Sequence, residues 1–255
     1  MPFLSHLQEL RNRLARTAVA IVLASILCFS VVGFLFKLLS TPLLQTFPDN
    51  SLIGTGPADA FIVKLKIALA SGFLLSLPYS FLEVWKFISP GLLDKEKKYA
   101  LPFVFFSSFF FICGVSFCFV FVLPIAFEFF AAEFTSIGVQ PTIRIGEYLS
   151  FVLKLLLVFG LVFEMPVVSF FLARLGILKA SFLIEKANYA IVIIFIVAAI
   201  VTPPDVVTQT LLAIPLMILY GLCIFIAKTF GKSPATSSPS LSVAAQNELQ
   251  MQQNR

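Results

Sequence analysis

Residues 151–172, FVLKLLLVFGLVFEMPVVSFFL, decide the class of fold to which this chain belongs. A helix of about 20 residues crosses the roughly 30 Å hydrocarbon layer of a bilayer, because each residue advances the helix axis by about 1.5 Å. The stretch is long enough, and its only charged residues are Lys154 and Glu164. It predicts a transmembrane helix with a carboxyl group near the middle of the membrane.

The composition of the whole chain is typical of a membrane protein. The 255 residues are 59% hydrophobic, include 31 phenylalanines and are only 12% charged, and the mean hydropathy is +1.01. The interior of a soluble domain of this length is too small to bury so much apolar surface. The net charge of +5 is better explained by membrane topology than by a nucleic-acid partner.

Six apolar segments predict an all-α membrane protein with six transmembrane helices. The predicted spans are 17–36, 67–87, 101–123, 151–172, 189–202 and 209–227. The last two are expected to be short, because their apolar cores, 190–201 and 211–227, cover only about 18 and 26 Å. Three prolines inside the spans predict bends, because proline leaves a carbonyl group of its own helix without a donor. These are Pro78, Pro166 and Pro215.

Basic residues indicate the orientation of the spans. Thirteen of the 18 lysines and arginines lie on the same side as the N-terminus, so both termini are expected in the cytoplasm. The long outer segments, 37–66 and 124–150, contain turn residues and mixed apolar stretches, which predict short helices over the outer face. Residues 1–228 form the predicted membrane domain, and the polar segment 229–255 is expected to be a disordered cytoplasmic tail.

Sequence motifs for catalysis are missing. The chain has no phosphate-binding glycine-rich loop, no cluster of metal ligands and no nucleophile beside a base, so we expect neither an enzyme nor a cofactor. The four cysteines lie inside apolar runs without the spacing of a metal site or a redox pair. There is also no internal repeat of the kind common in secondary transporters.

Glu164 is the strongest candidate functional residue, because a carboxylate at that depth costs on the order of 3 kcal/mol unless it faces water or a polar partner. The alternative is a protonated glutamate packed in the core and hydrogen-bonded to a neighbouring helix. Asp205 is well placed to cap the helix that follows Pro203 and Pro204. One turn further on, Gln209 is a candidate for a hydrogen bond between helices.

Other polar residues near the cytoplasmic face have simple structural interpretations. Glu9 lies four residues before Arg13 on a helical stretch, a spacing that favours a surface ion pair. Glu96 belongs to the charged segment LLDKEKKYA, for which a solvated loop is the default. Phe87 and Trp85 are expected to be aromatic residues at the membrane interface.

Four segments together resemble the TatC family, the receptor subunits of the twin-arginine protein translocase. They are HLQELRNRL at 6–14, LPYSFLEVWKFISPGLLDKEKK at 77–98, FGLVFEMPVV at 159–168 and TPPDVVTQTLLAIP at 202–215. Their order and their positions relative to the predicted spans match that family, and the resemblance covers roughly residues 3–228. A departure is LLD before Lys95, which leaves the carboxylate of Glu96 in place.

The resemblance implies a glove-shaped, concave six-helix receptor in the bacterial inner membrane, driven by the proton gradient. Its implied partners are twin-arginine signal peptides of folded cargo proteins, the single-span subunits TatA and TatB, and further copies of the receptor itself. The residues implied to bind the signal peptide are Glu9, Arg11, Phe87 and Glu96. Those implied for the groove and for docking of partner subunits are Glu164, Gln209 and Asp205.

Two carboxylates at the inner surface suit this function, because they accept the forked donors of two guanidinium groups in a geometry that lysine does not match. The alternative from another class is a proton-coupled small-molecule transporter that uses Glu164 as its carrier. The missing repeat and the pair of inner-face glutamates favour the receptor.

Overall fold

The computed structural model describes residues 3–47, 52–91, 100–202 and 205–231. Within these ranges the regular elements are helices, and the prediction of an all-α membrane protein is confirmed. In chain order they are α1 (Phe3–Phe29), α2 (Val32–Thr46), α3 (Asp59–Ile88), the 3-10 turn η1 (Ser89–Gly91), α5 (Ala100–Phe117), the π-helical turn η2 (Cys118–Val122), α6 (Leu123–Ser136), α7 (Ile145–Arg174), α8 (Ala180–Glu185), α9 (Ala187–Val201) and α10 (Val206–Phe230).

Five helical segments of the described chain are long and apolar enough to cross a membrane. They are His6–Phe29, Asp59–Ile88, Ala100–Ser136, Ile145–Arg174 and Val206–Phe230. A sixth apolar helix, α9, has only 15 residues and is short as expected. Helix α10 has 25 residues and extends beyond the predicted 209–227 at both ends, into the first residues of the predicted tail. Most of that tail, from residue 232 on, lies outside the described residues.

The first predicted span is wrong in its bounds. Instead of one helix over 17–36, α1 ends at Phe29 and a new helix begins at Val32. The hydroxyl of Ser30 donates a hydrogen bond of 2.7 Å to the carbonyl of Leu27, a local contact that competes with continuation of the helix. The outer segment 37–66 therefore contains most of α2, in agreement with the prediction of a short helix there.

The third predicted span, 101–123, continues far beyond its expected end. Helices α5 and α6 form one helical segment of 37 residues, Ala100–Ser136, joined by the π-helical turn η2. Pro124 lies in the first turn of α6 and has no N–H to donate. In the turn before it the backbone N–H of Leu123 bonds the carbonyl of Cys118, the wider spacing by which a π-helical turn keeps a helix continuous.

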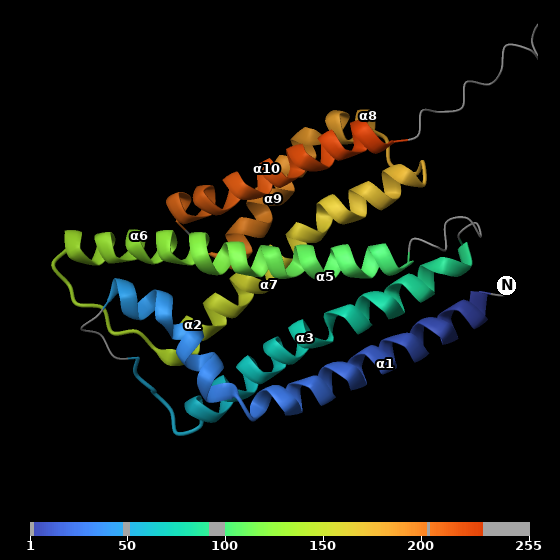
Figure 1. Ribbon diagram of the computed structural model, residues 1–255. Helices are drawn as coiled ribbons and strands as arrows, with labels where there is room; N and C mark the ends of the chain where they lie inside the picture. The colour runs from blue at the N-terminus through green and yellow to red at the C-terminus, as the bar shows by residue number, and fades with distance from the viewer. Residues whose placement is uncertain (1–2, 48–51, 92–99, 203–204, 232–255) are drawn as a thin grey trace, which may run out of the picture.

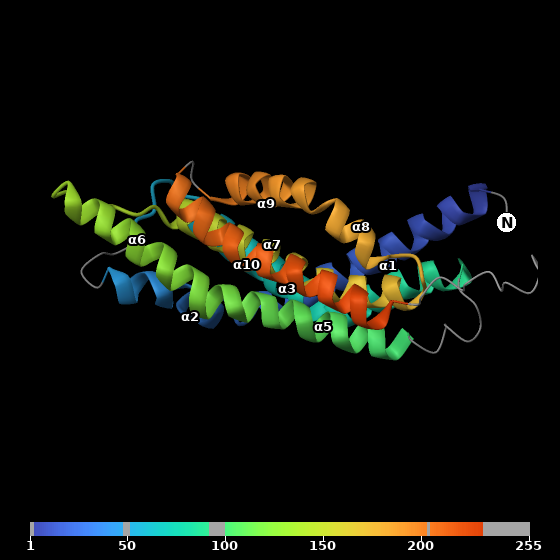
Figure 2. The same cartoon turned by 90° about the horizontal axis from the view of Figure 1, so that it is seen from above.

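The long helices run side by side, with their ends gathered at two ends of the bundle (Figure 1). One end holds the start of α1, the last turn of α3, the start of α5 and the last turns of α7 and α10. The opposite end holds α2 and α6, which pack on each other. Seen from above, α9 and α5 lie on opposite edges of the bundle (Figure 2). The last turn of α3 and the start of α5 therefore lie at the same end of the bundle (Figure 1).

The segments before α3 and before α7 are fastened together at the end that carries α2 and α6. The N–H of Ile53 donates to the carbonyl of Ile143 at 3.0 Å, and the N–H of Ile145 donates to the carbonyl of Ile53 at 2.9 Å. The hydroxyl of Tyr148 in α7 donates to the carbonyl of Leu39 in α2 at 2.6 Å. The two segments predicted as outer loops therefore form one connected layer with α2 and α6.

Glycines allow two pairs of helices to approach closely. A Cβ atom on Gly72 of α3 would lie 2.4 Å from the backbone nitrogen of Ser25 in α1. A Cβ atom on Gly114 of α5 would lie 2.6 Å from the carbonyl oxygen of Phe159 in α7, and one on Gly160 would overlap the ring of Phe111. In lipid, where the hydrophobic effect does not drive helices together, such close packing supplies much of the attraction between them.

Helix α7 supplies the centre of the core. Leu149, Val152, Leu155 and Phe159 repeat along one face of this helix and are completely buried. A smaller aromatic cluster lies toward the end of the bundle where α3 finishes: Trp85, Phe103 and Phe171 come from α3, α5 and α7, with ring centroids 5.0 to 5.9 Å apart. Trp85, expected at the membrane interface, is instead buried where these three helices meet.

Replacement of Gly72 tests the contact between α1 and α3. Gly72→Ala is expected to lower the free energy of unfolding in detergent by roughly 1–3 kcal/mol, because the new methyl group meets the backbone of α1. The control is Gly221→Ala in α10, where nothing lies within 4 Å and alanine's higher helix propensity favours the variant. Equal unfolding midpoints for the two variants would contradict this account, as would rescue of Gly72→Ala by Ser25→Ala.

Candidate functional site

An ionic cluster joins α1 to α3 at the end of the bundle where the chain begins. The guanidinium of Arg13 donates from Nε at 3.0 Å and from Nη2 at 2.5 Å to Oε1 of Glu9, one turn earlier in α1. Its Nη1 donates to Oε2 of Glu83 in α3 at 3.1 Å. The predicted pair of Glu9 and Arg13 is therefore present, but it is one part of a link between two helices.

Glu83 is the member of this cluster that sequence reasoning missed. Its side chain is only 3% exposed, and it also accepts a hydrogen bond of 3.3 Å from Lys86. Lys86, three residues later on the same helix, was a visible signal of an ion pair. Arg13 is 70 residues away in sequence, so only the packing of α1 on α3 shows that it is the other partner.

Phe87, one of the predicted site residues, belongs to α3 and packs against α1 near the same cluster. Its ring stacks on the imidazole of His6, with centroids 4.4 Å apart and planes 20° apart. His6 is three residues before Glu9, so it lies on the same face of α1. The structure thus brings Glu9 and Phe87 to one edge of the contact between α1 and α3. In the same part of α3, Trp85 packs on Phe103 of α5 and holds the last turns of α3 in place.

Beside the cluster, α1 carries an open polar pocket of about 330 Å³. It is lined by Gln8, Glu9, Asn12, Arg13 and Arg16. Glu9 is 30% exposed here, and within the described chain its Oε2 accepts no hydrogen bond. An incoming donor can reach Glu9, whereas Glu83 is covered by protein.

Two other predicted residues are not part of this cluster as the structure describes it. Arg11 is exposed and forms no ion pair with any described residue. Arg11 is two positions from Glu9 and two from Arg13, a rotation of about 200° around the helix axis, which turns its side chain toward the opposite face of α1. Glu96 lies outside the described residues, between the ends of α3 and α5.

Glu164 is buried in α7, with 8% of its surface exposed. Its Oε1 has no hydrogen-bond partner among the described residues, and the same is true of the nearby hydroxyl of Ser107 in α5 and of Ser108. The nearest charges along α7, Lys154 and Arg174, are each ten residues away, about 15 Å along the axis. A polar group that finds no partner inside the bundle is costly in lipid, so this position is suited to a polar group from outside the chain.

Asp205 caps the start of α10, and Gln209 lies in the first turn of that helix. The carboxylate of Asp205 accepts from the N–H of Thr208 at 2.7 Å and from the Thr208 hydroxyl, which confirms the predicted cap. The side-chain amide of Gln209 donates to the carbonyl of Phe195 in α9 at 3.0 Å, which confirms the predicted hydrogen bond between helices. No hydrogen bond among the described residues connects either residue to Glu164.

A metal or redox centre has no ligands in the part of the chain that the structure describes. No group of three or more His, Cys, Asp or Glu side chains lies close enough to hold a metal ion there. The four cysteines are free thiols. What the described geometry offers is a charged docking surface at one end and a buried carboxyl group in the bundle.

These features define a helical membrane protein with several spans and two candidate binding sites. A family model described as "Sec-independent protein translocase protein (TatC)" matches residues 5–215. A Sec-independent protein translocase protein TatC of Desulforapulum autotrophicum is 45% identical over 91% of this chain and 86% of its own length. The protein of the same name from Campylobacter jejuni is 38% identical over 90% of this chain and 94% of its own.

Solved structures agree with the sequence comparisons. A crystal structure titled "Twin Arginine Translocase Receptor- TatC" superimposes with a TM-score of 0.81 at 37% identity, covering 88% of this chain and 99% of that chain. The chain belongs to the TatC family of Sec-independent protein translocase proteins. It is therefore a multi-pass membrane component of a protein-transport machinery, and this assignment does not favour the alternative of a small-molecule transporter.

Loss of Glu83 is expected to destabilise the protein, because it removes the buried carboxylate that pairs with both Arg13 and Lys86. The side chain of Arg13 is only 18% exposed. Glu83→Ala should lower the free energy of unfolding by roughly 2 kcal/mol, because it removes hydrogen bonds between charged groups while Arg13 keeps its bonds to Glu9. Glu147→Ala removes a pair of 3.3 Å to Arg144 in which both side chains are more than half exposed and should cost less than about 1 kcal/mol. Denaturant titration in detergent compares them, and similar costs would rule out a special role for Glu83.

Proposed function

We propose that this protein is the receptor subunit of the twin-arginine translocase, and that it binds the signal peptides of folded cargo proteins at the end of the bundle where α1 begins. The observation that carries the proposal is the contact of Arg13 with Glu9 and Glu83. This surface already holds one guanidinium group between carboxylates from two helices. An arginine pair in a signal peptide presents the same donors to the same kind of acceptor.

The proposed signal-peptide site consists of Glu9, Arg11, Phe87 and Glu96. Support for Glu9 is its partly exposed side chain in the lining of the polar pocket, and support for Phe87 is its position against His6 on the same edge. Glu96 is included because its segment joins α3 to α5, whose ends meet at this end of the bundle. Arginine is preferred over lysine, since its planar fork matches a carboxylate in two places.

In the proposed orientation both termini lie in the cytoplasm of a bacterium, and the protein sits in the inner membrane. The basic residues support this orientation, and so does the gathering of the start of α1 and the end of α10 at one end of the bundle. The segments that contain α2 and α6 then face the outside. The glove-shaped concavity of the family stays a prediction.

Glu164 is proposed to meet the single-span partners TatA and TatB within the membrane. Its support is the carboxyl oxygen without a partner in a helix that brings Glu164 close to the hydroxyl group of Ser107. Gln209 and Asp205 are proposed to support docking indirectly, by fixing the geometry of the helix pair α9 and α10. Both side chains form hydrogen bonds within that pair. Movement of cargo, driven by the proton gradient, follows from assembly of these partners with several copies of this chain.

Binding of a synthetic signal peptide to the purified protein in detergent tests the proposed site. Peptides with Arg-Arg are expected to bind at least tenfold more tightly than the same peptides with Lys-Lys, and Glu9→Ala or Glu96→Ala should remove that preference. Glu147→Ala is the matched control, because its carboxylate also pairs with an arginine but lies near the start of α7. Binding that is indifferent to Lys-Lys, or unchanged in both variants, would refute the site.

Partner assembly tests the proposed role of Glu164. Glu164→Gln is expected to retain co-purification of the single-span partners better than Glu164→Leu, because glutamine keeps a donor and an acceptor at nearly the same volume. Both variants should retain binding of the Arg-Arg peptide, since residue 164 lies in the middle of α7, remote from the cluster at Glu9. Equal loss of the partners in the two variants, or equal retention, would contradict the hydrogen-bonding role.

A further inference from the structure

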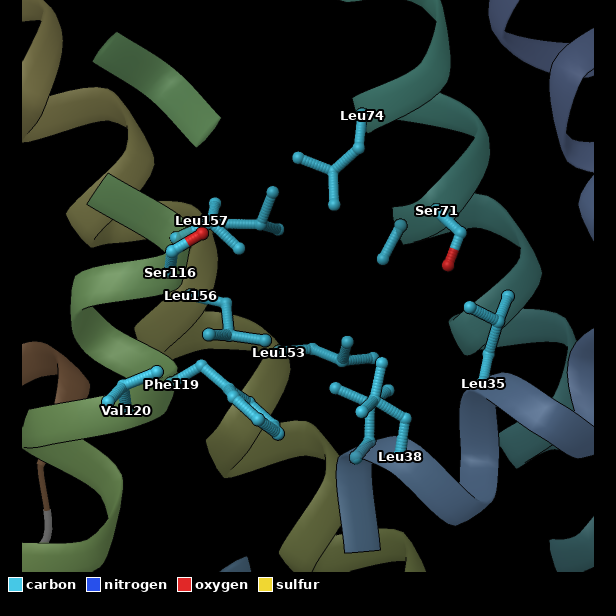
Figure 3. A pocket seen from close by; sticks show the side chains of 13 residues that line it. Leu35, Leu38, Ser71, Leu74, Ser116, Phe119, Val120, Leu153, Leu156 and Leu157 are labelled. Carbon is cyan, nitrogen blue, oxygen red and sulfur yellow. The ribbon is translucent and has the colours of Figure 1, made fainter. Parts of the chain in front are cut away.

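An apolar groove runs between α2, α3, α5 and α7, and nothing proposed above uses it. A cavity of about 270 Å³ is walled by leucines of α2, α3 and α7 together with Phe119 and Val120, whose side chains Figure 3 shows facing a common space. A second, more open cavity of about 570 Å³ lies against it and shares Ala70, Leu153 and Leu157. The two cavities form one continuous groove with an almost entirely apolar lining.

Two lysines stand at the rim of the open part of this groove. Lys66 of α3 and Lys154 of α7 both line it. The ammonium of Lys66 donates a hydrogen bond of 2.9 Å to the hydroxyl of Ser150, and Ser150 is one helical turn before Lys154 on the same face of α7. The two lysines therefore line the same cavity from two different helices, with Ser150 beside Lys66 and one turn before Lys154.

These lysines lack anionic partners among the described residues. The ion pairs there involve Arg13, Lys86, Arg144 and Lys186, and neither Lys66 nor Lys154 appears in one. Lys66 lies about 10 Å and Lys154 about 14 Å along the axis from the first residues of α3 and α7. Both side chains are exposed, and two cations of like charge that line one cavity repel each other and attract an anion.

We propose that this groove is a binding site for an anionic phospholipid. The phosphate of the headgroup lies between Lys66 and Lys154, and one acyl chain passes Leu157 and then lies along the wall formed by Ile21, Phe73 and Leu161. The two positive charges favour a lipid with an anionic headgroup. The apolar lining favours a ligand with an acyl chain over a free anion. The lipid fills a groove between α3 and α7 that the protein itself leaves open.

Native mass spectrometry of the full-length protein tests the site, with phosphatidylglycerol and phosphatidylcholine of identical acyl chains. Retention of phosphatidylglycerol is expected to exceed that of phosphatidylcholine. Lys66→Gln and Lys154→Gln should each lower the affinity for phosphatidylglycerol roughly fivefold, and the double variant more than tenfold. Lys66→Arg should retain binding, because it keeps the charge.

The matched control is Lys64→Gln, which removes the same charge from the same helix two residues away, on the face turned from the groove. Leu157→Trp, which fills the groove and keeps both lysines, should also weaken retention. Monodisperse elution of each variant shows that it is folded.

Several results would overturn the proposal. Equal retention of the two lipids, or a loss in Lys64→Gln as large as in Lys66→Gln, would show that general charge attraction is sufficient. Displacement of the lipid by inorganic phosphate at equal concentration would show an anion site without a role for the acyl chain. A photo-crosslinker at residue 157 that captures a protein segment instead of lipid in native membranes would show that the groove belongs to a protein partner.

Signal-peptide binding is expected to stay unchanged in Lys66→Gln and Lys154→Gln. That result would separate the lipid site from the proposed signal-peptide site.

Discussion

The cost of a charged group in an apolar solvent organises this molecule. Charges near the membrane need either a partner or access to water, and the described chain meets that need within the protein at one place and leaves it incomplete at two others. Arg13 and Glu83 satisfy each other across two helices. Glu164 keeps a carboxyl oxygen without a partner inside the bundle. Lys66 and Lys154 stand together at a groove without an acidic group of the described chain beside them. Each incomplete arrangement marks a place where another molecule can supply what the chain does not.

Close packing of the helices makes these placements definite. The absence of a side chain at Gly72 lets α1 approach α3 closely enough for Arg13 to reach Glu83. The glycines of α5 and α7 likewise let these two helices, which carry Ser107 and Glu164, approach each other closely. The aromatic cluster around Trp85 then fixes the last turns of α3 against α5 and α7. Rigid positions for a few polar groups follow from small residues and interlocking rings elsewhere.

Local sequence predicted much of the candidate site and of the fold because the relevant signals lie within a few turns. Glu9 and Arg13 are one turn apart, and Asp205 precedes the helix that it caps. The ends of helices were harder to predict. Helix α1 ends next to Ser30, inside an apolar run. The helix that begins with α5 continues past Pro124, because the π-helical turn before this proline keeps the helix continuous. Hydropathy does not mark these ends, since apolar residues stand on both sides of Ser30 and of Pro124.

The sequence by itself determined that the protein spans a membrane, where its spans approximately lie, which residues cap or pair locally, and which family it resembles. These properties depend on composition and on contacts between near neighbours in the chain. Only the tertiary structure decided that Arg13 is shared with Glu83, that His6 stacks on Phe87, and that Lys66 and Lys154 meet at one groove. Those partners are 70 or more residues apart, and their contacts exist only where two helices cross at a particular register.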